Sequence, residues 1–321
     1  MMPGPRVQQI LQNESPSRSA VAGELVRAHE ITHVLDALAA RRVFPILMKG
    51  AALAYSLYPS PAMRPRVDTD LLIPREDIAA ARDVLLRRGY VEPAMTDGEL
   101  VLGQMQMVKV DGFEIEHVFD IHWRISSQTL FADVLTYDEV HAGALAVPPL
   151  GPHARTASDP HALLLACVHP VMHHRNTDRP IWFSDIDLLA RRLSDDGLRE
   201  FARLALSKHV AGICARQLSV ARERFQTPVP SDVTDMLESS PSEPTAVYLR
   251  PHRRWHHELW WSVRNLRTWR DRRRLLREVF FPGAQYMLDT YHVGPRGVIL
   301  LPALYFHRCA YGAFKVLTGR K

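Results

Sequence analysis

The stretch ILMKGAALAYSLYPSPAMRPRVDTDLLI, residues 46–73, contains the pattern that decides the fold. An apolar run over 43–49 predicts a buried strand, and Gly50 permits the tight turn that ends it. An alanine-rich segment then predicts a short helix, and the prolines after it enforce a loop. A second apolar segment, 67–73, predicts another strand. The expected order is therefore strand, turn, helix, loop and strand.

Two carboxylates on the second of these strands, Asp68 and Asp70, are the first candidates for chemistry. Alternate side chains of a strand point to the same face, and these two lie about 7 Å apart along the backbone. A carboxylate pair of this kind can bind Mg²⁺, which prefers oxygen ligands and substrate phosphates. A site with two such ions suits phosphoryl or nucleotidyl transfer.

A third carboxylate from a neighbouring strand usually completes a two-metal site. The Asp-Gly pair at 111–112 is a strong hairpin signal and joins predicted strands over 104–110 and 113–125. Asp120 lies on the second of these strands, and we expect it to be the third acid. Glu116 shares its strand face and is the alternative.

The first turn is a candidate phosphate site. Lys49, Gly50 and Ala51 lie where the first strand meets the helix, and free backbone N–H groups there can hold a triphosphate together with the helix dipole. The basic side chains of Lys49, Arg64 and Arg66 could neutralise its charge. Each element alone is weak evidence, because most aspartate pairs on strands are solvated surface residues. Their order along the chain is far more specific.

This order resembles the nucleotidyltransferase superfamily of the DNA polymerase β type, in which a glycine turn at a helix start precedes an acid pair on the next strand. It is most similar to a bacterial family of uncharacterised nucleotidyltransferases, NTP_transf_5, with LKGxAL, YP, R, DxDLLV and VDLHWR segments. The matching pieces here are LMKGAAL (47–53), YP (58–59), Arg64, DTDLLI (68–73) and FDIHWR (119–124), with echoes from Asp159 to His174 and from Trp182 to Leu189.

The resemblance implies a nucleotidyltransferase fold in which Asp68 and Asp70 are metal ligands and Asp120 is the third acid. Ala51 stands where the superfamily usually has a second glycine or a serine, so one hydroxyl contact to phosphate is missing. The resemblance implies no particular substrate, because the family has little assigned chemistry.

The fold class we expect is α+β, a small mixed β-sheet core with flanking helices followed by an all-helical C-terminal domain. We expect a flexible lead-in over 1–18, the nucleotidyltransferase core over 19–157, and a helical domain over 158–321 that forms the other wall of the cleft. Apolar periodicity predicts one helix from Ser19 to Arg42. Further helices are expected near 160–174, 181–193, 197–206, 208–225 and 255–279, with a last apolar helix from Gly297 that Pro302, His307 and Arg308 interrupt.

A histidine cluster in the helical half allows two interpretations. His169 and His173 are four residues apart, so on a helix they share a face, and Asp185 follows on the next helix. One interpretation is a separate metal site, as in a His/Asp hydrolase. The favoured one is a cleft wall whose histidines hydrogen-bond to Asp185 or to substrate. His122 and Arg124, on the face of Asp120, are further candidates for contacting the acceptor.

Residues 250–278 are strongly basic, with ten arginines against three acidic residues and four interleaved tryptophans. Arginines and aromatic residues together could bind nucleic acid or an anionic membrane surface. The favoured alternative is an amphipathic helix with its tryptophans in the core. Otherwise the segment would bind a polyanionic substrate.

The composition favours a cytoplasmic bacterial protein. The net charge is +5, three scattered cysteines give no disulfide framework, and no signal-peptide stretch is present. No run of about 18 apolar residues predicts a membrane span.

We therefore expect a metal-dependent nucleotidyltransferase that transfers NMP from an NTP to an unidentified acceptor, which could be a small metabolite, a peptide or a macromolecule. The expected cofactor is a pair of Mg²⁺ ions, with Mn²⁺ as a possible substitute, and Asp120 could also take the acceptor proton. The alternative is a degenerate nucleotidyltransferase fold that only binds a nucleotide, RNA or a protein. A His/Asp metal hydrolase is the third hypothesis.

Overall fold

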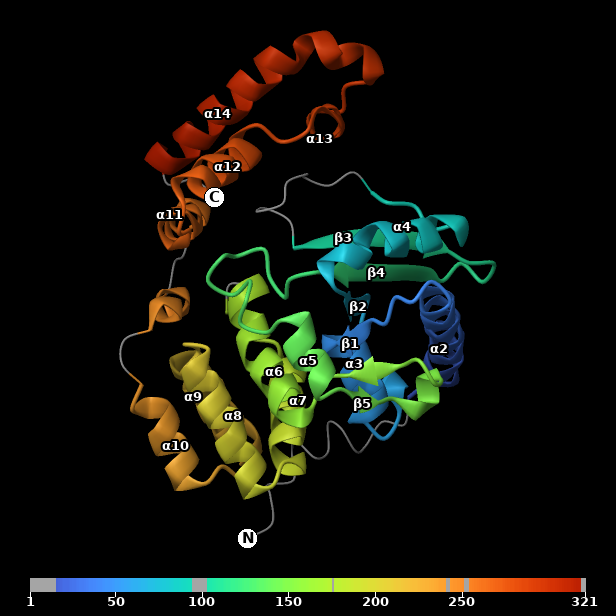
Figure 1. Ribbon diagram of the computed structural model, residues 1–321, viewed down its shortest axis with the longest axis vertical. Coiled ribbons are helices and arrows are strands. Elements are labelled where there is room, and N and C mark those ends of the chain that lie inside the picture. Colours follow the sequence, from blue (N-terminus) through green and yellow to red (C-terminus); the bar gives the residue numbers. More distant parts are fainter. Residues whose placement is uncertain (1–15, 94–102, 175, 241–242, 251–253, 319–321) are drawn as a thin grey trace.

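The structure is a computed structural model that describes residues 16–93, 103–174, 176–240, 243–250 and 254–318. A mixed β-sheet with flanking helices forms one half of the body, and a bundle of helices forms the other half (Figure 1). The expected α+β class with a helical C-terminal part is confirmed. Most of the expected lead-in, 1–18, lies outside the described residues.

Six strands form one sheet in the order β3-β4-β2-β1-β6-β5. β1 is antiparallel to β2, and β2 is parallel to β4. β3 and β4 are antiparallel, which confirms the hairpin that the Asp-Gly pair predicted. The strands are β1 (Ile46–Met48), β2 (Thr69–Leu72), β3 (Gln104–Val110), β4 (Glu116–His122), β5 (Leu145–Ala146) and β6 (Arg155–Thr156).

The helices cover both faces of the sheet. In the sheet half they are α2 (Arg18–Ala39), α3 (Lys49–Ser56), α4 (Ile78–Arg87) and α5 (Tyr137–Ala142). In the helical half they are α6 (Asp159–His173), α7 (Pro180–Arg192), α8 (Asp195–Ser207), α9 (Ala211–Phe225), α10 (Ser231–Glu238), α11 (Trp255–Asn265), α12 (Trp269–Phe280), α13 (Ala284–Thr290) and α14 (Leu301–Thr318).

A continuous hydrophobic core joins the sheet to the helical half. It contains Met48 and Leu72 of the sheet together with Leu163 of α6 and Phe201 of α8. A second cluster lies on the other side of the sheet, where α2 and α4 pack against it. Because α6 and α7 share a core with β1 and β2, their position relative to the strand ends is fixed by packing.

The basic segment differs from its prediction. One helix was expected over 255–279, but the chain forms α11 and α12, because Leu266 adopts an extended conformation (ψ 132°) and Thr268 caps the start of α12. None of the four tryptophans is buried, and Trp260 and Trp269 are 52% and 69% exposed. The expectation of tryptophans in the core was therefore wrong.

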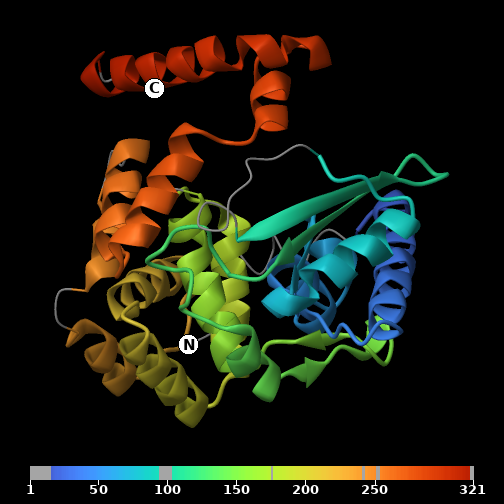
Figure 2. The same ribbon diagram turned by 45° about the horizontal axis from the view of Figure 1, so that its top comes forward.

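The C-terminal helices α12 to α14 extend away from the body (Figure 2). Pro302 does not interrupt the last helix, since it occupies the first turn of α14, where its missing N–H has no partner to lose. Over the part of the chain that the structure describes, none of the helices is long and apolar enough to cross a membrane.

Candidate active site

The pairing of two parallel strands brings the predicted carboxylates together. Asp70 on β2 and Asp120 on β4 face each other in register, and Asp68 precedes β2 by one residue. Glu116 lies at the far end of β4, opposite Val110, and its side chain is exposed. Of the two candidates for the third acid, Asp120 is thus the one beside the pair.

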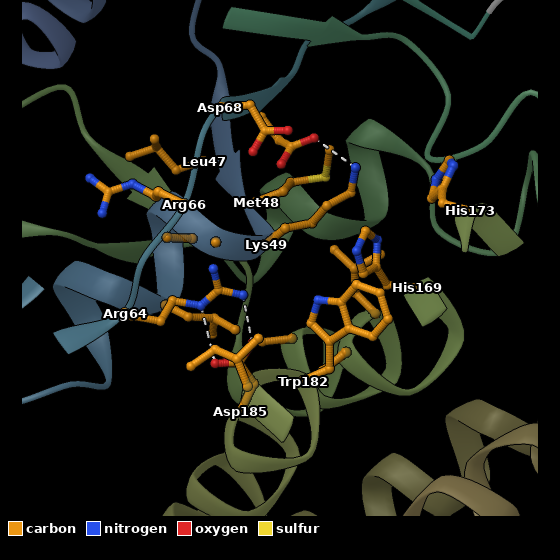
Figure 3. A pocket seen from close by; sticks show the side chains of 18 of the residues that line it. Leu47, Met48, Lys49, Arg64, Arg66, Asp68, His169, His173, Trp182 and Asp185 are labelled. Carbon is orange, nitrogen blue, oxygen red and sulfur yellow. Dashed lines mark hydrogen bonds and ion pairs between the residues drawn. The ribbon is translucent and has the colours of Figure 1, made fainter. Parts of the chain in front are cut away.

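These carboxylates line a cavity of about 460 Å³ between the sheet and the helical bundle (Figure 3). Cavities of this size are typical of small-molecule and cofactor sites. One side of it is built from β1, α3, β2 and β4, and the other from α6 and α7. The polar and aromatic lining residues are Lys49, Arg64, Arg66, Asp68, Asp70, Gln104, Asp120, Thr156, His169, His173, His174, Arg179, Trp182 and Asp185.

Asp70 is the most strongly held of the three carboxylates. The Lys49 ammonium nitrogen lies 2.6 Å from Asp70 Oδ1, and His122 Nε2 lies 2.8 Å from the same oxygen. Burial raises the pKa of Asp70, but Lys49 and His122 outweigh that effect and hold it far below its usual range. Asp70 is therefore ionised at neutral pH.

Asp68 and Asp120 lack such compensation. Burial and the charges of Asp70 and Asp120 raise the pKa of Asp68 to about 6. Burial and the charge of Asp70 also raise the pKa of Asp120, although the Gln106 amide opposes the shift. Gln104 and Gln106 donate to the two oxygens of Asp120 at 3.3 and 3.1 Å and fix its orientation.

The donor set fits a divalent cation. Asp70, Asp120 and His122 each offer one ligand atom, and these atoms lie within 4.8 Å of one another. Asp68 lies beside this group and adds a third carboxylate to the cavity wall. Raised pKa values at Asp68 and Asp120 report unbalanced negative charge, which a hard cation with oxygen preference would neutralise.

The start of α3 holds one strained residue and one tightly packed glycine. Lys49 has φ 50°, a left-handed conformation that is costly for a residue with a side chain. A Cβ atom on Gly50 would lie 2.5 Å from an Arg64 guanidinium nitrogen, so only glycine fits there without moving that side chain. The turn is therefore specified by close approach as well as by conformation.

Arg64 ties this turn to the helical half. Its Nε and Nη2 atoms donate to the two oxygens of Asp185 on α7 at 3.2 and 2.7 Å, and the Tyr58 hydroxyl donates to the same carboxylate at 2.8 Å. The side chains of Arg64 and Asp185 are both almost fully buried. Bidentate pairs of this kind are strong and geometrically fixed, so Arg64 acts here as a clamp between the two halves.

Arg66 is among the lining residues, but its guanidinium turns away from the carboxylates (Figure 3). Its guanidinium donates to Glu24 of α2 and lies over the Tyr55 ring, 5.1 Å from the ring centroid. In Figure 3 it points away from Asp68 and Lys49. From the sequence, both arginines were expected to help neutralise phosphate charge. In the structure, a carboxylate from a helix holds each of them.

The sequence pattern of the family described as uncharacterised nucleotidyltransferases matches residues 4–226. The chain belongs to this family. It is accordingly a nucleotidyltransferase, and its reaction uses an NTP as substrate. No curated protein matches the chain in sequence.

Among solved structures, this nucleotidyltransferase is similar to the solution structure of the antibiotic-resistance factor ANT(2'')-Ia. The similarity covers 63% of this chain and 97% of that chain, with 13% sequence identity and a TM-score of 0.40. Likeness at this level says nothing about the acceptor.

The histidines predicted for a hydrolase site do not assemble with Asp185. That carboxylate is taken by Arg64 and Tyr58, and His173 Nε2 donates to the Ile125 carbonyl oxygen at 3.0 Å. His169 and His173 instead line the wall of the nucleotidyltransferase cavity that faces the carboxylates. The predicted cleft wall is present. The predicted hydrogen bond from a histidine to Asp185 is absent among the described residues, because Asp185 pairs with Arg64.

Two other predicted regions lie outside the cavity. Arg124 is half-buried just beyond β4 and is not among the lining residues. The described part of the basic segment, 254–278, also contributes no residue to the cavity lining. A polyanion bound there would not reach the carboxylates through these side chains.

From the sequence, His122 was assigned to the acceptor, but it is not among the lining residues and instead bonds Asp70. Its place two residues after Asp120 on the same strand face could have shown it to be a neighbour of Asp70. His174, Arg179 and Trp182 line the cavity and were missed from the sequence. They come from the end of α6 and the start of α7, and their convergence depends on how these helices pack.

Proposed function

We propose that this nucleotidyltransferase is metal dependent and transfers NMP to a hydroxyl or another nucleophile of a small acceptor that enters the cavity. The supporting observation is the parallel pairing of β2 with β4, which sets Asp70 opposite Asp120 beside Asp68. Three clustered carboxylates would repel a polyphosphate, so they serve an NTP site only together with cations.

The residues proposed to hold Mg²⁺, or Mn²⁺ in its place, are Asp68, Asp70 and Asp120. A bound divalent ion would supply charge neutralisation at the NTP phosphates. His122 Nε2 donates to Asp70 or, in the tautomer that leaves Nε2 without a proton, offers an additional ligand atom to the same group. One or two ions are compatible with this donor set.

The chain's own side chains carry the rest of the reaction. The acceptor oxygen forms a bond to the α-phosphorus, and the bond from that phosphorus to the bridging oxygen breaks, so pyrophosphate leaves. Asp120 takes the acceptor proton, a role for which its raised pKa is suited. Lys49 and the N–H groups at the start of α3 are placed to neutralise the leaving pyrophosphate.

The test is label transfer from α-³²P-labelled NTPs in the presence of Mg²⁺ and fractions of host metabolites. The wild type should produce a labelled acceptor, and Asp68→Asn and Asp70→Asn should each reduce the yield at least 100-fold. Asp83→Asn is a matched control, since Asp83 lies on the exposed face of α4 and pairs with Arg41 and Arg87. Full activity in both cavity variants would refute the proposal.

A further inference from the structure

Four aromatic rings form one cluster on the wall of the cavity opposite the carboxylates. His169, His173 and His174 come from the C-terminal end of α6, and Trp182 comes from the first turns of α7. The His174 and Trp182 rings are 4.5 Å apart between centroids and tilted by 31°, and His169 meets the Trp182 ring edge-on at 5.4 Å. Figure 3 shows His169 and Trp182 together, with Lys49 between them and Asp68.

The four rings of this wall carry little charge of their own. Burial, with Lys49 nearby, lowers the pKa of His169 well below its usual range and that of His173 to about 3. Burial and Arg179 also lower the pKa of His174. The three imidazoles are therefore neutral rings at neutral pH. A surface of neutral rings stacks on flat, uncharged groups and gives no charge attraction for phosphates.

One polar atom on this wall has no partner. His169 Nδ1 is buried and makes no hydrogen bond within the described residues. A buried polar atom left unpaired is costly. Because this atom has almost no accessible surface, a ligand would pair with it only after the His169 ring turns toward the cavity. What the wall offers a nucleobase directly is therefore its stacking surface.

We propose that this ring cluster is the nucleobase subsite for the NTP, an inference that rests on the proposed function. An NTP whose α-phosphate lies at the carboxylates must place its base elsewhere in the same cavity. Among the described residues that line the cavity, the aromatic rings all belong to this cluster. Base stacking on aromatic side chains is the main sequence-tolerant source of affinity for a base.

The members of the cluster have different parts in this subsite. Trp182 is only 7% exposed and orients the rings around it. His174 is more open and offers stacking surface. Arg179 is exposed and holds its guanidinium carbon 5.1 Å from the centroid of the Trp182 ring, where it can stack on a bound base from the other side.

The test measures binding by calorimetry in Mg²⁺ for two kinds of probe. The first is each of the four ribonucleoside triphosphates, and the second is inorganic tripolyphosphate, which has no base. His174→Ala should weaken binding of the preferred NTP about ten-fold and leave tripolyphosphate affinity within two-fold of the wild type. Trp182→Leu should do the same. His161→Ala is the matched control, because His161 is also on α6 but bonds Ser158 outside the cavity.

The possible results distinguish a failure of the proposed base subsite from a failure of the proposed function. Unchanged NTP affinity in both cluster variants would overturn the subsite, and so would an equal loss for NTP and tripolyphosphate. A wild type that binds neither probe would overturn the proposed function as well. Retained tripolyphosphate binding also shows that the variants are folded. A weaker NTP signal with constant tripolyphosphate affinity therefore supports the nucleobase assignment directly.

Discussion

Replacing Asp68 by asparagine should stabilise the metal-free fold while it abolishes transfer. Asp68 has a pKa of about 6 in the folded protein against an ordinary value of 3.8. That gap corresponds to about 3 kcal/mol of unfavourable free energy for the ionised form. Because Asp68 is partly exposed, solvent screening reduces the gain for the variant to about 1–2 kcal/mol, or a rise in Tm of about 2–4 °C.

The pH dependence of this gain has a definite sign. Between 3.8 and about 6 the folded state binds more protons than the unfolded state at Asp68, so wild-type stability falls as pH rises through that window. The unfavourable free energy is complete above about pH 7 and absent below about pH 3. The Tm advantage of Asp68→Asn should follow the same course, large at pH 7.5 and small at pH 4.5.

The assay is thermal unfolding of metal-free protein at both pH values, followed by addition of Mg²⁺. Added Mg²⁺ should raise the Tm of the wild type by binding the folded state and should do so far less in the variant. Asp185→Asn is the matched control in the same cavity, and it should destabilise by about 2 kcal/mol or more because it leaves the buried Arg64 charge uncompensated. An Asp68→Asn variant less stable than the wild type at pH 7.5 would refute the reasoning.

Three further outcomes follow from the cavity. Gly50→Ala should destabilise by about 1–3 kcal/mol, since its Cβ meets Arg64, whereas Gly112→Ala has open space and should be near neutral in Tm. Lys49→Met should lower kcat/KM about 100-fold, and an unchanged kcat/KM would remove Lys49 from the mechanism. At Mg²⁺ concentrations below saturation, transfer should fall as pH drops through about 6, because a proton on Asp68 then competes with the metal; a constant rate from pH 7 to 5 under these conditions would contradict this.

The sequence predicted the carboxylate geometry because that geometry depends on strand periodicity. Asp68 and Asp70 alternate along one strand, and Asp120 is central in a strand whose hairpin signal is local. Both features are properties of neighbouring residues, and the parallel pairing of β2 with β4 then places Asp70 opposite Asp120. The helices α6 to α9 were predicted for the same reason, since their apolar spacing is local.

The partners of the two arginines could not be predicted from the sequence, because they depend on the tertiary structure. The long side chains of Arg64 and Arg66 can reach carboxylates on other elements, and their partners, Asp185 and Glu24, are 121 and 42 residues away in the chain. Nothing near Arg64 in the sequence indicates that pairing. The break at Leu266 was missed because apolar spacing continues through it, while the backbone between α11 and α12 is extended.

The Arg64–Asp185 ion pair links the two sides of the cavity, the proposed phosphate site and the ring cluster. Asp185 lies three residues after Trp182 on α7, so about one helical turn separates the arginine clamp from the ring cluster. On the other side, the Arg64 guanidinium fills the space beside Gly50, at the turn that carries Lys49. One ion pair therefore fixes the turn at the proposed phosphate site and the helix that carries the proposed base site. Substitutions at Arg64 should consequently weaken NTP and tripolyphosphate binding together, whereas substitutions in the ring cluster affect the NTP alone.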